Sequence, residues 1–143
     1  MTGGCACGGV RYRLASAPFD AGWCHCRTCQ LNSGSPAMAF ASVPRGDFRY
    51  DQGAELVTSF ASSETGRRSF CSRCGTPLFV AVEHQPDTVD FSIATLDRPD
   101  DVPPGFHIFY DSRIAWAPAG DTLPRHAQLR SATRGLPPGQ TTL

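Results

Sequence analysis

A small, mainly β domain with little helix is the fold that the sequence predicts, on three observations. Several short stretches alternate apolar and polar residues, a period of two that is typical of strands with one face exposed to water. Fourteen glycines and twelve prolines among 143 residues leave little room for long helices. Seven cysteines, gathered in three clusters, could staple the chain by binding metal ions.

The strands are expected one after another along the chain. Residues 10–14 alternate valine, tyrosine and leucine with two arginines, which predicts a half-exposed strand. The continuous apolar run at 78–82 suits a strand buried on both faces. The other expected strands cover residues 37–42, 48–50, 56–60, 89–94 and 107–110. Turns rich in proline and glycine separate them at 44–46, 51–53, 85–87 and 103–105.

Two further segments complete the expected architecture. The residues after Cys26, through Leu31, could form one short turn of helix. From about Ala127 the chain is rich in Ser, Thr, Gly, Pro and Gln and has few apolar residues. A single domain is therefore expected over residues 1–126, followed by a flexible C-terminal tail over residues 127–143.

Charge and hydropathy argue against two classes of partner. Thirteen acidic residues balance thirteen arginines, and there is no lysine, so the formal net charge is zero and a general nucleic-acid binder is not expected. The apolar runs are too short for a helix that crosses a membrane. The N-terminus lacks the basic and apolar regions of a secretory signal, and a cytoplasmic location is expected.

The cysteine clusters have spacings that are typical of metal ligands. Disulfides rarely persist in a reducing compartment, and seven is an odd number, so metal binding is favoured over a disulfide framework. The motifs are C-x-C at Cys5 and Cys7, C-x-C-x-x-C at Cys24, Cys26 and Cys29, and C-x-x-C at Cys71 and Cys74. Thiolates at such spacings can surround a zinc ion tetrahedrally, at about 2.3 Å.

The number of ligands suggests one closed site and one open site. The first and last motifs together supply four sulfurs, the usual set of a structural zinc, whereas the central motif supplies three and leaves a position open, as in a catalytic zinc. Alternatively, the first two cysteines of the central motif could pair with the C-x-x-C motif. His84 or His107 could also close the central site. His25, between two ligands, is expected to point away from the ion.

The chemistry of a three-cysteine zinc site favours an incoming thiol. Three thiolates give the site a formal charge of minus one, which weakens the Lewis acidity needed for zinc-hydroxide hydrolysis. Coordination would instead stabilise an incoming thiol as the thiolate, its nucleophilic form. Arg27, beside the cluster, could offset the charge or hold a substrate carboxylate, or could be a solvated loop residue.

The order of these motifs resembles a known family over about residues 3–126. The elements are C-x-C-G-x-V-x-Y at 5–12, C-H-C-x-x-C at 24–29, Ser33-Gly34, R-x-F-C-x-x-C-G-T-x-L at 68–78, and H-I-x-x-D-S-x-x-x-W at 107–116. Together they resemble the glutathione-dependent formaldehyde-activating enzyme family, which includes the centromere protein V type domain. The tripeptide Ile114-Ala115-Trp116 departs from the family, which often has proline before this tryptophan.

The resemblance implies a fold, two metal sites and an activity. The fold is a zinc-stapled β-tent of several short coiled antiparallel sheets. The implied activity is addition of glutathione to formaldehyde, which gives S-hydroxymethylglutathione and belongs to the carbon–sulfur lyases. The implied ligands are Cys5, Cys7, Cys71 and Cys74 for a structural zinc, and Cys24, Cys26 and Cys29 for a second zinc that is catalytic or binds substrate.

Some residues outside the cysteine motifs invite a role, among them Ser62, Ser63, Arg67 and Arg68 just upstream of the C-x-x-C motif. Arg68, upstream of the C-x-x-C motif, could hold a carboxylate of the thiol ligand, whereas a solvated hairpin is favoured for Arg67. His107 and Trp116 could line the pocket, although core packing is favoured for Trp116. Phe79, within the apolar run, is expected in the core.

Two functions of different classes follow. The first is an enzyme that binds a glutathione-like thiol at the three-cysteine zinc and adds it to a small aldehyde such as formaldehyde. The second is a non-catalytic zinc-binding β domain that recognises a protein or a small ligand. A fourth protein ligand at the central site would favour the second function, and an open position would favour the first. A sulfoxide reductase is disfavoured, because metal binding occupies all seven cysteines.

Overall fold

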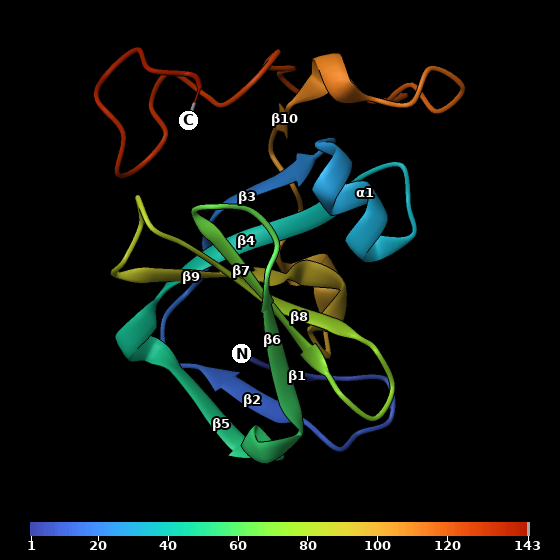
Figure 1. Ribbon diagram of the computed structural model, residues 1–143, viewed down its shortest axis with the longest axis vertical. Coiled ribbons are helices and arrows are strands. Elements are labelled where there is room, and N and C mark those ends of the chain that lie inside the picture. The colour runs from blue at the N-terminus through green and yellow to red at the C-terminus, as the bar shows by residue number, and fades with distance from the viewer. Residues whose placement is uncertain (143) are drawn as a thin grey trace.

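Two β-sheets form the framework of the computed structural model, which describes residues 1–142 (Figure 1). The smaller sheet is antiparallel, in the order β1 (Thr2–Gly4), β2 (Arg11–Leu14) and β5 (Phe48–Gln52). The larger sheet has the order β10 (His107–Ile108), β3 (Phe19–Cys24), β4 (Met38–Pro44), β9 (Thr88–Ser92), β8 (Pro77–Val82), β7 (Gly66–Cys71) and β6 (Val57–Ala61). All its neighbouring strands are antiparallel except β10 and β3, which are parallel.

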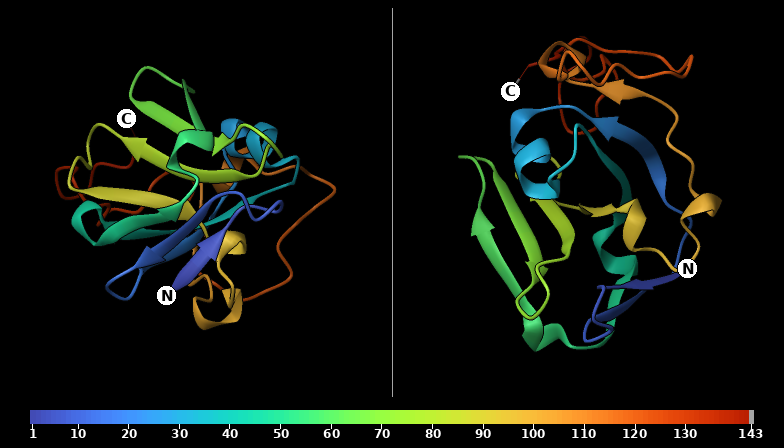
Figure 2. Two further views of the ribbon diagram at one scale, coloured as in Figure 1. Left: turned by 90° about the horizontal axis from the view of Figure 1, so that it is seen from below. Right: turned by 90° about the vertical axis from the view of Figure 1, so that its right-hand side faces the viewer.

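The described residues contain one α-helix, α1 (Arg27–Ser33), and five short 3-10 turns. The prediction of a mainly β domain with little helix is thus confirmed. The smaller sheet lies towards one end of the molecule, whereas α1, β10 and the C-terminal segment lie towards the other end (Figures 1 and 2). The larger sheet connects these two ends, so β3 and β7 carry side chains from the core up to the region beside α1.

An aromatic cluster forms the centre of the core, where the smaller sheet packs on the larger one. Tyr12 of β2 is fully buried, as the alternation in residues 10–14 predicts, and Arg13 beside it is exposed. The Tyr12 ring contacts three rings from other strands, those of Phe48, Phe79 and Phe91. Its hydroxyl group forms a hydrogen bond with Thr95 at 2.7 Å, so this buried polar group is satisfied.

The helix is short because both of its ends are capped. It begins after Cys26, whose sulfur accepts a hydrogen bond from the amide of Cys29 at 3.3 Å. It ends at Gly34, which has a φ of 65° in the left-handed region that glycine tolerates best. Because β3 ends at Cys24 and the helix follows within three residues, strand and helix hold three cysteines close together.

Some local expectations differ from the structure. The pattern did not predict β1, β3 or β7. The strand expected at 89–94 ends at Ser92 and continues as a 3-10 turn, Ile93–Thr95. The core position favoured for Trp116 is wrong, because this side chain is 77% exposed. Arg67 is exposed, consistent with a solvated hairpin residue.

Residues 127–142 contain no helix or strand, yet they contact the body of the molecule. The amide of Phe109 donates a hydrogen bond to the carbonyl of Gln128 at 2.9 Å, and Leu129 is buried. The domain boundary at residue 126, the flexibility of the tail and the β-tent comparison stay predictions. Within residues 1–142, no helix combines the length and the apolar character that crossing a membrane requires.

Candidate metal centres and the adjoining cavity

Four cysteines meet in one cluster. Cys5 and Cys7 lie between β1 and β2, Cys71 is the last residue of β7, and Cys74 follows it. The sulfur atoms of Cys5, Cys7, Cys71 and Cys74 all lie within 4.8 Å of one another. The sulfur of Cys7 is 3.4 Å from that of Cys5 and 3.9 Å from that of Cys71. Sulfurs placed tetrahedrally around zinc at about 2.3 Å are about 3.8 Å apart, so this cluster fits a closed four-sulfur site. The alternative pairing, which used the central cysteines, is not the one that the structure brings together.

Backbone turns and one hydroxyl group shape this four-cysteine cluster. The amide of Val10 donates a hydrogen bond to the sulfur of Cys5 at 3.2 Å, and Gly75, with a φ of 75°, permits the tight turn after Cys74. The hydroxyl of Thr76 lies 3.2 Å from the sulfur of Cys74. This hydrogen bond, together with those from the backbone amides of Thr76 and Cys7, lowers the pKa of Cys74 to about 5, which favours the thiolate form that binds metal.

The other three cysteines form a second cluster at the junction of β3 and α1. The sulfur atoms of Cys24, Cys26 and Cys29 lie within 4.8 Å of one another. Hydrogen bonds with Cys24 and Cys29 lower the pKa of Cys26. The pKa of Cys24 is raised by the hydrogen bonds that Cys24 forms with Cys26 and Cys29. Among residues 1–142, no histidine, cysteine, aspartate or glutamate adds a fourth ligand atom within that distance. The cluster therefore fits a site with three protein ligands and one open position.

Arg68 of β7 lies directly beside this three-cysteine cluster. It is only 6% exposed, and its Nη2 donates a hydrogen bond to the sulfur of Cys29 at 3.2 Å. Its Nε has no hydrogen-bond partner, and no acidic side chain of residues 1–142 forms an ion pair with it. A buried cation so placed offsets negative charge on the three sulfurs. Arg27, by contrast, is exposed, bonds to Gln30 within the helix and does not line the cavity.

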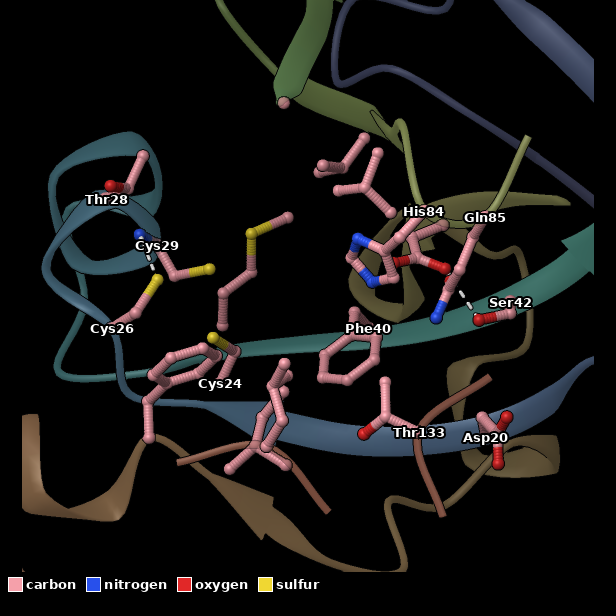
Figure 3. Close-up of a pocket in the computed structure, with 18 of the residues that line it drawn as sticks. Asp20, Cys24, Cys26, Thr28, Cys29, Phe40, Ser42, His84, Gln85 and Thr133 are labelled. Atoms are coloured by element: carbon pink, nitrogen blue, oxygen red, sulfur yellow. Dashed lines mark hydrogen bonds between the residues drawn. The ribbon is translucent and has the colours of Figure 1, made fainter. Parts of the chain in front are cut away.

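The histidines that could have closed the central site lie elsewhere. His25 points away from the sulfurs, and its Nε2 lies 2.8 Å from Nδ1 of His107. Nε2 of His107 is in turn 3.1 Å from the carboxylate of Asp121, so His107 is a buried hydrogen-bonded residue and does not line the cavity. His84 does line the cavity, and its Nδ1 is buried without a partner, but Figure 3 shows it well separated from the cysteines.

A cavity of about 320 Å³ opens from the three-cysteine cluster (Figure 3). Apolar side chains line much of its wall, among them Met38, Phe40, Val80, Phe106 and Leu129. Polar groups line it too, among them Asp20, Ser42, His84, Asp90, Thr133 and Arg134, and Figure 3 shows Asp20, Ser42 and Thr133 away from the cysteines. Such a cavity can take an elongated ligand that has sulfur at one end and polar groups at the other.

Asp90 is the functional candidate that the sequence pattern missed. Its neighbours Val89 and Phe91 are buried on the core face, so the alternation in β9 assigns Asp90 to the polar face, which would ordinarily meet water. In the structure that face meets the cavity. The hydroxyl of Ser42 donates a hydrogen bond to Oδ1 of Asp90 at 2.6 Å, and burial raises the pKa of this carboxyl group to about 6.

The fold and the site together define a class of protein. It is a small β protein with two cysteine clusters that could hold metal ions, one of them enclosed by four sulfurs and the other opening with three sulfurs onto a cavity.

Comparison with known proteins names the family. The model of the family described as glutathione-dependent formaldehyde-activating enzyme matches residues 1–112, and the chain belongs to this family. A Halomonas elongata protein, provisionally named a glutathione-dependent formaldehyde-activating enzyme, is 28% identical over 123 residues, which cover 81% of this chain and 78% of that protein. An uncharacterized lyase of Schizosaccharomyces pombe is 33% identical over 79 residues, which cover 55% of this chain and 56% of the lyase.

The fold is also found in a solved structure. The crystal structure of a Rhodobacter sphaeroides protein superposes with a TM-score of 0.58 at 27% identity, and the match covers 68% of this chain and 88% of that one.

Proposed function

We propose that the protein is a zinc-dependent carbon–sulfur lyase of the glutathione-dependent formaldehyde-activating type. A thiol such as glutathione would bind at the three-cysteine cluster and add to a small aldehyde such as formaldehyde. One observation carries the proposal: the sulfurs of Cys24, Cys26 and Cys29 converge at one end of a cavity of about 320 Å³, and no fourth ligand from residues 1–142 joins them. Family membership and the relative named as a lyase support it.

Zinc suits the donor atoms of both clusters, so we propose two zinc ions per chain. Thiolates are soft ligands, and tetrahedral sets of them are typical of zinc sites. The four-sulfur cluster would hold a structural ion. At the three-sulfur cluster, Cys24, Cys26 and Cys29 would hold the second ion, which would supply a positive charge that stabilises the sulfur of a ligand as the thiolate.

The proposed reaction forms one carbon–sulfur bond. The thiol releases its proton to water when it binds, the resulting thiolate attacks the carbonyl carbon of the aldehyde, the π electrons of the carbonyl move to its oxygen, and this oxygen takes a proton back from water to give the S-hydroxymethyl product. The lyase direction is the reverse of these steps. Arg68 would stabilise negative charge on the sulfurs, because its buried guanidinium already donates to Cys29. The apolar walls, among them Met38 and Phe40, would limit access of water to the thiolate.

The proposal is tested by two measurements on the zinc-loaded chain. The rate of S-hydroxymethylglutathione formation should exceed the uncatalysed rate, and Cys26→Ser should abolish the excess. In the cobalt-substituted protein, added glutathione should strengthen the sulfur-to-cobalt charge-transfer absorption, which reports a new sulfur ligand. Arg49→Gln is the matched control, since Arg49 is exposed on β5 and outside the cavity.

A chain that binds two metal ions, yet neither accelerates the reaction nor gains a sulfur ligand from glutathione, would contradict the proposal. That result would favour the alternative, a non-catalytic zinc-binding β domain that recognises a protein or another small ligand.

A further inference from the structure

The end of the cavity opposite the cysteines is built partly by the C-terminal segment. Leu129, Arg130, Thr133 and Arg134 all line the cavity, and all lie beyond residue 112, where the match to the family model ends. Figure 3 shows Thr133 and Asp20 at the opposite end of the cavity from the three cysteines. These residues are therefore placed to contact the part of a ligand that is remote from its sulfur.

Specific contacts hold this segment against the cavity. Nη2 of Arg130 forms an ion pair with Oδ1 of Asp20 at 2.6 Å, and the Arg130 guanidinium lies 4.0 Å from the centroid of the Phe106 ring. The side-chain amide of Gln85 donates a hydrogen bond to the carbonyl of Arg134 at 2.9 Å. Residues 130 and 134 are thus fixed by the strand and loop residues that form the opposite walls.

Backbone strain occurs at two positions on the cavity wall, Asp20 at the far end and Phe109 beside Ile108, which pairs with Cys24. Only Asp20 and Phe109 among the non-glycine residues of 1–142 have a positive φ, of 50° and 53°, and both line the cavity. Such conformations cost free energy and persist where the surrounding contacts require them, often at ligand sites. At Asp20 this conformation accompanies the ion pair that anchors Arg130.

The charges at this end leave two groups without a charged partner in the described residues. Asp20 and Arg130 neutralise each other. Arg134 forms no ion pair, and its guanidinium lies over the ring of Phe19 at 4.4 Å. Asp90 has the hydroxyl of Ser42 as its hydrogen-bond partner. One cation and one carboxyl group therefore remain available to a ligand.

We infer that Arg134 and Asp90 determine the specificity of the cavity for thiols whose far end carries an amino-acid head group. The carboxylate of such a head would pair with Arg134 and its ammonium group with Asp90, while the apolar walls of the cavity hold the chain between head and sulfur. This inference rests on the proposed function for the identity of the ligand as a thiol. It identifies two residues that would discriminate among thiols, and Arg134 lies outside the region that the family model matches.

The test separates the head-group subsite from the sulfur site by using a ligand without a free thiol. S-methylglutathione keeps both charged groups of the head but cannot form a thiolate. In calorimetric titrations of the zinc-loaded full chain, it should bind the unmodified protein, and Arg134→Gln and Asp90→Asn should each weaken binding about tenfold. Arg98→Gln, an arginine 81% exposed and outside the cavity, is the matched control and should leave binding unchanged. Circular dichroism establishes that each variant is folded.

A second arm uses turnover with two thiols. Arg134→Gln should raise the KM for glutathione about tenfold with little change in kcat, and should leave the KM for 2-mercaptoethanol, which lacks a head group, unchanged. Binding of S-methylglutathione that does not depend on either residue, or equal effects on both thiols, overturns the inference. Residue-dependent binding of S-methylglutathione without any turnover supports the subsite and contradicts the proposed function instead.

Discussion

At the scale of single residues, the buried guanidinium of Arg68 controls the charge around the three-cysteine cluster. A zinc site with three thiolates carries a formal charge of minus one, and Arg68 supplies one compensating positive charge at 3.2 Å from the sulfur of Cys29. This charge would favour entry of a further thiolate, since it reduces repulsion between anionic sulfurs. The same position shows how β7 accommodates a buried arginine that has no acidic partner in an ion pair among residues 1–142.

The first prediction concerns replacement of Arg68 by an uncharged side chain. Arg68→Met should lower kcat/KM for the thiol addition by about ten- to a hundredfold, because a charge-assisted hydrogen bond of roughly 1.5–3 kcal/mol is lost. It should also raise the pH at which kcat/KM reaches its plateau, since the bound thiol loses a stabilising cation. Arg67→Met, on the same strand but exposed and outside the cavity, is the control and should change neither quantity. An unchanged pH profile in Arg68→Met would argue against the electrostatic role.

Asp90 provides a second prediction, on the pH dependence of stability. Its pKa is raised to about 6 from an ordinary value of 3.8, mainly by burial, with Ser42 and Arg68 acting in the opposite direction and Asp20 in the same one. His84, which lines the same cavity, has a pKa lowered by burial and is uncharged at neutral pH. The unfolded chain therefore releases this proton near pH 4, whereas the folded chain holds it to about pH 6.

The contribution of Asp90 to the free energy of unfolding should consequently fall as the pH rises from about 4 to about 6. Asp90→Asn keeps an oxygen acceptor for Ser42 and removes the buried charge, so it should stabilise the protein at pH 7 by up to about 3 kcal/mol. The difference should shrink to less than about 1 kcal/mol at pH 4, where the folded carboxyl group is protonated and the unfolded one is about half protonated. Urea unfolding at pH 4, 5, 6 and 7 measures it, and a gain independent of pH would show that the charge is not responsible.

At the scale of elements, the periodic pattern predicted strands where their environment is simple. The stretch around Tyr12 alternates because one face of β2 packs on the core and the other meets water. The apolar run at Leu78 likewise became β8, and the short helix after Cys26 became α1. In each case burial follows from local residue type alone.

The strands that the pattern missed do not simply place one face on the core and the other in water. In β7, Arg67 was expected in a solvated hairpin, and although Arg68 was a candidate to hold a ligand carboxylate, the sequence did not show that a strand carries it into a cavity. In β3 and β1, glycine and aspartate interrupt the apolar pattern. The cysteine spacing indicated which residues could bind metal, but the far end of the cavity combines strand, loop and C-terminal residues whose meeting depends on the tertiary fold.

A buried hydrogen-bonded chain ties β3 to β10 behind the three-cysteine cluster. The carboxylate of Asp121 can only accept, so Nε2–H of His107 donates to it, and Nδ1 of His107 then accepts from Nε2–H of His25. Because His25 lies between Cys24 and Cys26, this chain fixes the orientation of the segment that carries both sulfurs.

The third prediction concerns the coupling within this chain. Asp121→Ala and His107→Phe should each destabilise the protein by about 1–2 kcal/mol, since each removes a partner of a buried ring nitrogen. In the double variant the loss should be smaller than the sum, because Asp121 acts through His107. A double-mutant cycle of urea unfolding at pH 7 gives the coupling free energy. Strict additivity would indicate that the residues stabilise the fold independently.

At the scale of the whole molecule, the two cysteine clusters have different structural consequences. The four-cysteine cluster joins the N-terminal hairpin to the end of β7, and Cys7 and Cys71 are separated by 64 positions in the chain. The three-cysteine cluster draws all its ligands from the junction of β3 and α1, which hydrogen bonds and packing already hold. Loss of a metal ion from the first should therefore release two distant segments, whereas loss from the second should leave the fold in place.

The fourth prediction follows from this difference. A zinc-loaded chain treated with increasing chelator should release one ion first from the three-cysteine site, which has fewer ligands and opens onto the cavity, with loss of activity but little change in circular dichroism. Release of the second ion should coincide with unfolding. Cys26→Ser should bind one ion and keep its unfolding temperature within a few degrees, whereas Cys71→Ser should lower that temperature by at least about 10 °C. If both ions leave in a single step together with the fold, or if Cys26→Ser unfolds as readily as Cys71→Ser, then the two clusters share one structural role and the central site is not the open, substrate-binding one.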